Sequence, residues 1–230
     1  MKLLFDLPPN PSLQIVGQTS RFPVRRIFCV GRNYAAHAAE MGNEVDREAP
    51  FYFTKSAHSI APSGAELPYA LGTSDLHHEM ELVVALGKAG TRIPLQSAHE
   101  HIFGYGAGLD MTRRDLQAAA KEKRRPWATG KDFDASAILA PLVPAALLEP
   151  IGPRRIALSV NGDVRQDAQL SDMVWSVPEL IAHLSTLYTL APGDLIMTGT
   201  PAGVGPVVAG DFIEGQIDGL PPVSLRLLPR

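Results

Sequence analysis

The chain alternates between short apolar runs and stretches rich in Gly, Pro, Asn and Asp. Many residues in the apolar runs are β-branched or aromatic, which favours strands over helices. We predict strands at residues 24–30, 51–54, 82–86, 102–110 and 195–198. The run at 82–86 is apolar without alternation, which is typical of a strand that is buried on both faces.

Turn signals divide the C-terminal part of the chain into two predicted hairpins. The dipeptide Asn161-Gly162, which suits a type I′ turn, separates the runs at 156–160 and 163–166. The pair Asp218-Gly219 occupies the centre of a second predicted hairpin over residues 211–228.

Three segments have helical character. Apolar residues of the segment 177–190 recur every three or four positions, which predicts an amphipathic helix packed on the core. A short alanine-rich helix is predicted after Asn33, which can act as its N-cap. Thr112 and Asp115 have the spacing of a capping box, so a third helix is expected to begin at Thr112 and to reach the basic cluster at 121–125.

The rest of the pattern indicates one mostly β domain. Residues 1–23 contain several prolines and have room for two short strands at most. Scattered Pro and Gly predict that residues 56–76 form loops, and no linker or internal repeat divides the chain. We therefore predict an α+β fold, mostly β, with a short N-terminal segment at residues 1–23 and a single domain at 24–230.

Composition and charge argue against several classes of function. The 230 residues are 45% hydrophobic and carry a net charge of −3, with acidic and basic residues mixed throughout. This pattern predicts no nucleic-acid partner and no membrane partner, and no apolar run reaches the length of a membrane span. A single cysteine, Cys29, fits a reducing compartment, so we expect a cytoplasmic protein.

A pair of acids precedes the strand at 82–86. Glu79 and Glu81 are two positions apart, and that spacing places both carboxylates on one face of a strand. Two adjacent carboxylates that lose hydration are stabilised by a cation, and oxygen ligands select Mg²⁺, Mn²⁺ or Ca²⁺ over zinc. Asp110, at the end of a glycine-rich strand, is a candidate for a third ligand. The alternative is a pair of solvated acids at a strand end.

His37 and Glu40 form a second candidate pair. They lie three positions apart on the short predicted helix, so they are neighbours on one face. A carboxylate beside an imidazole orients the ring and raises its basicity, as a base that activates water requires. The alternative is an ordinary surface ion pair.

Other polar residues are candidates for anion binding. Arg114 and Gln117 lie near a predicted helix N-terminus and near Asp110, where a forked Arg donor and free N–H groups suit a carboxylate. The glycine-rich loop 199–205 can direct N–H groups at a ligand. It lacks the lysine of a phosphate loop, which argues against a nucleotide. Lys131 is isolated in a short loop, and its position alone indicates a surface residue.

Five ordered motifs resemble those of the fumarylacetoacetate hydrolase family over nearly the whole chain. They are G-R-N-Y-x-x-H-x-x-E-M from Gly31, H-H-E-x-E-L from His77, G-Y-x-x-G-L-D-M-T from Gly104, K-x-F-D from Lys131 and T-G-T-P-x-G-V-G from Thr198. Within the family they are most similar to the short acylpyruvate hydrolases, particularly the fumarylpyruvate hydrolases of bacterial gentisate degradation.

The resemblance implies a mixed β-roll of the family's C-terminal-domain type, a homodimer and a site for Mg²⁺ or Mn²⁺, with Ca²⁺ as a possible substitute. It assigns a role to each matching position. The implied roles are metal ligation by Glu79, Glu81 and Asp110, water activation by His37 and Glu40, stabilisation of an enolate by Lys131, and binding of the pyruvyl group by Arg114, Gln117 and Thr200.

The implied reaction is metal-dependent hydrolysis of a carbon–carbon bond in an acylpyruvate, most specifically fumarylpyruvate to fumarate and pyruvate. A fumaryl group ends in a second carboxylate, for which Arg32, Lys55 and Arg47 in the loop 43–50 are candidate cations. Two alternatives stay open. The fold also supports decarboxylation of oxaloacetate or decarboxylation and isomerisation of related oxo-diacids, which need no attacking water. The second alternative is a metal-stabilised dimer that has no catalytic activity. The presence of both His37 and Glu40 favours hydrolysis over these alternatives.

Overall fold

The strand β8 (Met80–Leu86) is buried along its whole length and lies inside the largest sheet. Because successive side chains of a strand point to opposite faces, Leu82 and Val84 enter one hydrophobic cluster while Val83 and Ala85 enter another. A strand covered on both faces needs an unbroken apolar run. The predicted burial of this segment is therefore confirmed.

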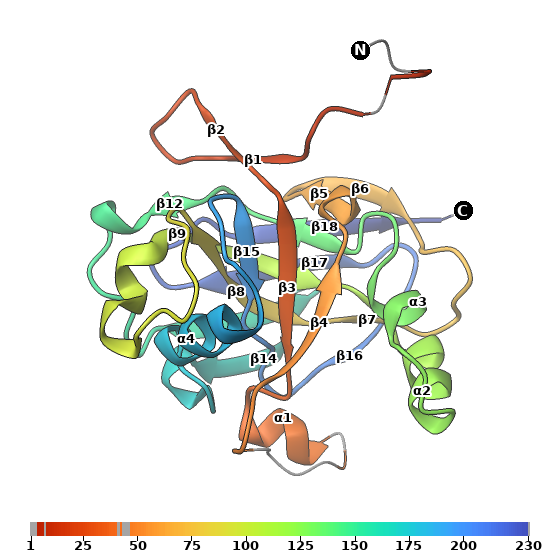
Figure 1. The fold of residues 1–230 in the computed structure, drawn as a ribbon. Helices are drawn as coiled ribbons and strands as arrows, with labels where there is room; N and C mark the ends of the chain where they lie inside the picture. The colour runs from red at the N-terminus through yellow and green to blue at the C-terminus, as the bar shows by residue number, and fades with distance from the viewer. Residues whose placement is uncertain (1–3, 7, 41, 43–46, 230) are drawn as a thin grey trace.

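The computed structural model describes residues 4–6, 8–40, 42 and 47–229 (Figure 1). Its other strands are β1 (Ser12–Gln14), β2 (Arg21–Pro23), β3 (Arg26–Gly31), β4 (Phe51–Lys55), β5 (Ile60–Pro62), β6 (Ala65–Pro68), β7 (Leu76–His78), β9 (Ile102–Asp110), β10 (Thr112–Arg113), β11 (Ala137–Leu139), β12 (Val143–Pro144), β13 (Arg155–Val160), β14 (Asp163–Gln169), β15 (Asp194–Met197), β16 (Gly205–Val207), β17 (Phe212–Ile217) and β18 (Val223–Leu228).

The α-helices are short and lie around the sheets. They are α1 (Ala35–Glu40), α2 (Arg114–Glu122), α3 (Ala128–Lys131) and α4 (Val177–Leu187), and 3-10 turns occur at Ala57–Ser59, Leu95–His101, Ala145–Leu147 and Leu170–Asp172. None of the helices in the described part of the chain has the length and apolar character needed to cross a membrane.

Two mixed sheets enclose the larger hydrophobic cluster. The first has the order β4-β3-β15-β8-β9-β11-β5, with β12 paired to β9, and the second has the order β14-β13-β17-β18-β6. Most neighbours are antiparallel, whereas β15 with β3, β11 with β5 and β18 with β6 are parallel. A small sheet, β10-β7-β16, carries part of the polar site described below. The predicted α+β, mostly β class is confirmed.

The N-terminal segment forms one small hairpin of β1 and β2, which lies beside one end of the large sheet in Figure 1. Leu13, Ile15 and Phe22 from this segment join the smaller hydrophobic cluster, and Ile15 forms a bridge with Leu142. The expectation of two short strands at most is confirmed. That the domain begins at residue 24 stays a prediction.

Both predicted hairpins are present, as β13 with β14 and as β17 with β18. The amphipathic helix is present as α4, with Leu180, Ile181 and Leu184 fully buried. It ends earlier than predicted, and Leu187 is 58% exposed. The apolar residues between 187 and 190 therefore do not continue the helix, which was predicted to reach residue 190.

The prediction of loop at residues 56–76 is wrong. The segment contains β5 and β6, and each is paired on one side only, at the edge of a different sheet. The partners lie far along the chain, so the local Pro and Gly content gave no indication of this pairing.

The helix expected to begin at Thr112 begins at Arg114 instead. Thr112 lies in β10 opposite His77. The carboxylate of Asp115 accepts hydrogen bonds from the Thr73 hydroxyl at 2.6 Å and the Ser74 amide at 3.1 Å. A tertiary contact has therefore replaced the expected capping box. The polar loop expected near 43–50 includes residues 43–46, which lie outside the described residues.

Gly104 allows the closest approach between two strand backbones. A Cβ atom at this position would lie 2.3 Å from the carbonyl oxygen of Val143 in β12. No real contact is this short, and the obstacle is backbone, so the pairing of β9 with β12 requires glycine here.

We expect Gly104→Ala to lower the free energy of unfolding by about 1–3 kcal/mol, because overpacking forces the backbones apart. Gly152→Ala is the matched control, since its added Cβ would meet only the Pro150 carbonyl oxygen at 3.8 Å. Urea unfolding of both variants measures the difference. Equal stability of the two variants would contradict the close-packing interpretation.

Candidate active site

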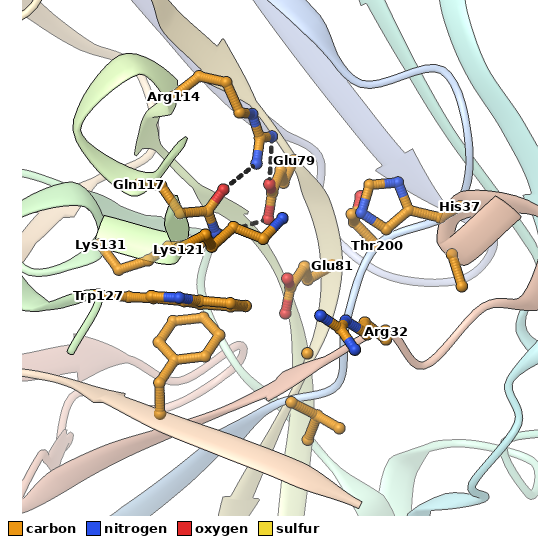
Figure 2. A pocket seen from close by; sticks show the side chains of 14 residues that line it. Arg32, His37, Glu79, Glu81, Arg114, Gln117, Lys121, Trp127, Lys131 and Thr200 are labelled. Carbon is orange, nitrogen blue, oxygen red and sulfur yellow. Dashed lines mark hydrogen bonds and ion pairs between the residues drawn. The ribbon is translucent and has the colours of Figure 1, made fainter. Parts of the chain in front are cut away.

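One cavity contains most of the residues that the sequence singled out (Figure 2). It lies where the end of β3, the helix α1, the start of β8 and the helices α2 and α3 meet. The predicted residues that line it are Arg32, His37, Glu79, Glu81, Arg114, Gln117, Lys131 and Thr200.

Three carboxylates converge at the floor of this site. Glu79 lies in the break between β7 and β8, Glu81 lies in β8, and Asp110 ends the neighbouring strand β9. The antiparallel pairing places Asp110 beside Glu79, whose carbonyl oxygen accepts the Asp110 amide at 2.9 Å. One oxygen from each of the three buried side chains lies within 4.8 Å of the others.

Glu79 and Asp110 are held by buried cations. The Lys131 ammonium lies 2.6 Å from Glu79 and 2.7 Å from Asp110, and Arg114 lies 2.5 Å from Glu79. Burial alone would raise the pKa of Glu79, but Lys131 and Arg114 together hold it well below its usual range. Burial lowers the pKa of Lys131, yet Asp110 and Glu79 raise it above the ordinary value. Both groups therefore stay charged.

Glu81 differs from the other two acids. Among the described residues no Lys, Arg or His forms an ion pair with it, and its carboxylate accepts the Gly199 amide at 2.9 Å. Burial, Asp110 and Glu79 raise the pKa of Glu81 well above its usual value. A buried carboxylate without a cation beside two other acids fits a divalent metal that prefers oxygen ligands. The residues present thus fit Mg²⁺ or Mn²⁺.

His37 and Glu40 are neighbours on α1, as their spacing predicts. The imidazole Nδ1 lies 3.4 Å from the Glu40 carboxylate, and the amide of Gly203 donates to the same carboxylate at 3.1 Å. If Nδ1 carries the proton, Nε2 has a free lone pair. Burial lowers the pKa of His37, which keeps the ring neutral at neutral pH. The pair has the arrangement of a general base.

A chain of polar contacts fixes Arg114 at the opposite wall. Its guanidinium donates to Gln117 at 2.7 Å and to Nδ1 of His77 at 3.3 Å, and His77 contacts Asp75 at 2.9 Å. Each residue thus contacts the next in a chain that runs from Asp75 through His77 and Arg114 to Glu79. Neither His77 nor Asp75 was predicted to be part of the site, although His77 opens the motif that carries the paired acids.

Gln166 is a third residue to which the sequence motifs gave no role. It is fully buried, and its amide donates to the Thr200 hydroxyl and to the Pro201 carbonyl, both at 2.8 Å. Its oxygen accepts the amide of Met80 at 3.0 Å, next to Glu79. Gln166 thus positions Thr200 against the strand break. It lies on a hairpin strand with no motif around it, so no local signal was present.

Lys55 does not occupy the place that was expected. Its side chain is fully buried and does not line the cavity; its ammonium lies 2.8 Å from Asp110 and donates to the backbone carbonyl of Lys131. This placement does not support contact with the far end of a substrate. Lys55 instead compensates the charge of Asp110 from beneath the site. The expected role fails because β4 directs this side chain inward.

Three further residues complete the lining of the cavity. Trp127 is only partly buried and lies beside Phe53, with ring centroids 6.0 Å apart. Lys131 is 2% exposed, although its sequence position alone indicated a surface residue. Arg32 lines the cavity as proposed and has a φ of 60°, a left-handed conformation that is strained for a residue with a side chain.

Most of the chain is similar in sequence to known proteins. The fumarylacetoacetate hydrolase C-terminal family matches residues 26–227. The chain is 50% identical over 191 residues to a fumarylpyruvate hydrolase of Ralstonia sp, covering 82% of this chain and 99% of that protein. It is 43% identical over 199 residues to a mitochondrial oxaloacetate decarboxylase of Dictyostelium discoideum, covering 85% of this chain and 90% of that protein.

A solved structure has nearly the same fold. The fumarylpyruvate hydrolase of Pseudomonas aeruginosa, determined in complex with Mn²⁺ and pyruvate, superposes with a TM-score of 0.96. It is 47% identical, and the match covers 100% of both chains.

We expect Mg²⁺ or Mn²⁺ to raise the melting temperature of the unmodified protein, because a ligand that binds only the folded state stabilises it by about 2.7 kcal/mol at one hundred times its Kd. Glu81→Gln should lose this increase. The metal-free variant should unfold no more easily than the metal-free parent, since burial disfavours the charge on Glu81. Differential scanning calorimetry measures all four states.

The exposed Glu66→Gln variant is the control for loss of one carboxylate. A metal-dependent increase that survives in Glu81→Gln would show that this carboxylate is not a ligand.

Proposed function

The chain belongs to the fumarylacetoacetate hydrolase family, and from that premise we propose that it hydrolyses the carbon–carbon bond of fumarylpyruvate to give fumarate and pyruvate. The observation that carries the proposal is that His37, a neutral and oriented base, lines the same cavity as Glu79, Glu81 and Lys131. The likeness to the Ralstonia and Pseudomonas enzymes supports it. We propose Mg²⁺ or Mn²⁺ as the cofactor, held by Glu79, Glu81 and Asp110.

A bound divalent ion would act as a Lewis acid on the 2-oxo acid end of the substrate and would favour negative charge there. The protein residues carry the remaining steps. His37 removes a proton from water through Nε2, while Glu40 holds Nδ1 and favours the charged ring that forms. The water oxygen attacks the C4 carbonyl carbon, the C3–C4 bond breaks, and its electron pair leaves with the pyruvate fragment.

The leaving fragment is an enolate, which needs positive charge nearby. Lys131 has a buried ammonium that both Glu79 and Asp110 keep protonated, so a fixed charge is available without reorganisation. We assign binding of the pyruvyl end to Arg114 and Gln117, which line the cavity and are joined by a hydrogen bond of 2.7 Å. A proton then returns to the enolate carbon, which gives pyruvate, and the carboxylic acid fragment leaves as fumarate.

Decarboxylation of oxaloacetate is the second candidate, and the likeness to the Dictyostelium enzyme favours it. That reaction also forms the enolate of pyruvate, so it would use Lys131 and the three carboxylates. It needs no attacking water and therefore no base at His37. The two reactions are separable by a single substitution.

His37→Ala should lower kcat for hydrolysis of fumarylpyruvate by about 10² to 10⁴, the usual contribution of a general base. Decarboxylation of oxaloacetate and the affinity for oxalate, a mimic of the pyruvate enolate, should change far less. Steady-state ultraviolet assays and oxalate titration give these values. His99→Ala, which removes an exposed imidazole, is the control.

If hydrolysis and decarboxylation fell by the same factor in His37→Ala, His37 would be needed for binding or folding, and the role in water activation would be wrong.

The pH dependence should reflect the same ring. Because burial lowers the pKa of His37, its basic form persists below pH 6.5, so kcat/KM should be constant near neutrality and should fall only at lower pH. Contact with Glu40 raises the pKa of His37, so Glu40→Gln should move the acidic limb to still lower pH. A limb that stayed in place or moved upward would exclude His37 as the titrating base.

Other features stay predictions from the sequence. They are the homodimer, the cytoplasmic location, the lack of nucleic-acid and membrane partners, and a place in gentisate degradation.

A further inference from the structure

The cations that line the cavity divide into two groups. Arg114 and Lys131 form ion pairs with Glu79 at 2.5 and 2.6 Å. Arg32 and Lys121 also line the cavity, but within the described residues neither forms an ion pair with an acid. The paired cations compensate Glu79 and Asp110, whereas Arg32 and Lys121 add positive charge that has no ion-pair partner among the described residues.

Lys121 reaches this cavity from the same helix face as the pyruvyl-binding residues. It follows Gln117 by four positions and Arg114 by seven on α2, so the three side chains lie along one stripe. Figure 2 shows the side chain of Lys121 extending from α2 across the cavity, with Arg32 approaching from the other side. Lys121 therefore lies farther along the helix than the residues proposed for the pyruvyl end.

The surroundings of Lys121 favour an anion. Burial lowers the pKa of Lys121, and the charges of Arg32, Arg114 and Lys131 lower it further, while Glu79 opposes them. A carboxylate placed between Lys121 and Arg32 would relieve this repulsion. Beside it, the Trp127 ring lies 5.5 Å from the Lys121 ammonium and forms part of the cavity wall. An aromatic surface suits a planar, unsaturated carbon chain.

We propose that Lys121 and Arg32 bind the far carboxylate of the substrate, so that the site selects acylpyruvates that end in a second acid group over those that end in a methyl group. This inference rests on the proposed function. It replaces Lys55, whose ammonium is committed to Asp110, with Lys121 as the residue that sets this specificity.

The test compares fumarylpyruvate with acetylpyruvate, which lacks the far carboxylate. In the unmodified enzyme kcat/KM should favour fumarylpyruvate. In Lys121→Met and in Arg32→Met that ratio should fall by about 10- to 100-fold, with each factor of ten corresponding to about 1.4 kcal/mol. Lys123→Met is the control, because it removes an exposed charge from the end of the same helix without touching the cavity.

A second measurement uses binding alone. Fumarate and crotonate differ by the far carboxylate, so in the presence of Mn²⁺ fumarate should bind more tightly to the unmodified protein, and Lys121→Met should remove the difference. An equal loss for both substrates in Lys121→Met would place Lys121 at the pyruvyl end and overturn the proposal. An unchanged substrate ratio would also overturn it.

The proposed hydrolysis and the proposed role of Lys121 can be rejected independently of each other. If the unmodified enzyme hydrolysed neither acylpyruvate, the proposed function would be wrong, and the comparison of fumarate with crotonate would still decide whether Lys121 binds a second carboxylate. If both substrates were hydrolysed with equal kcat/KM, the proposed chemistry would stand and the role of Lys121 would be rejected.

Discussion

The ion pairs of Lys131 with Glu79 and Asp110 are the interactions on which the site depends. Removing such charges from water costs several kcal/mol for each ion, and the cost is recovered only where partners are close and hydrogen-bonded. The fold meets this condition by adding Arg114 at Glu79 and Lys55 at Asp110. Both carboxylates are thereby held in fixed positions in a buried place, where they can serve as ligands of a divalent ion.

A single loop connects Glu81, the third carboxylate, to the pair that contains the base. The glycine-rich segment that follows β15 donates the Gly199 amide to Glu81 and the Gly203 amide to Glu40. Both glycines have positive φ angles, and a Cβ on Gly203 would lie 1.9 Å from the backbone oxygen of Arg165. This conformation therefore requires glycine, and it lets one loop hold both Glu81 and the Glu40 carboxylate that contacts His37.

Periodicity and motif spacing predicted those features that depend on neighbours along the chain. The strand ending at Asp110 and the contact of His37 with Glu40 follow from local patterns, and both are present. Contacts between distant segments were not predictable in this way. Lys55 turns toward Asp110 because of how β4 packs, and Gln166 reaches Thr200 from a hairpin strand that has no distinctive local sequence.

We propose that a metal held by three buried carboxylates and a base in the same cavity together hydrolyse a carbon–carbon bond. The most direct test is the rate of fumarylpyruvate hydrolysis before and after exhaustive chelation. We predict that chelation abolishes the reaction and that Mg²⁺ or Mn²⁺ restores it, with fumarate and pyruvate formed in equal amounts. Full activity in the chelated protein would show that the reaction needs no metal.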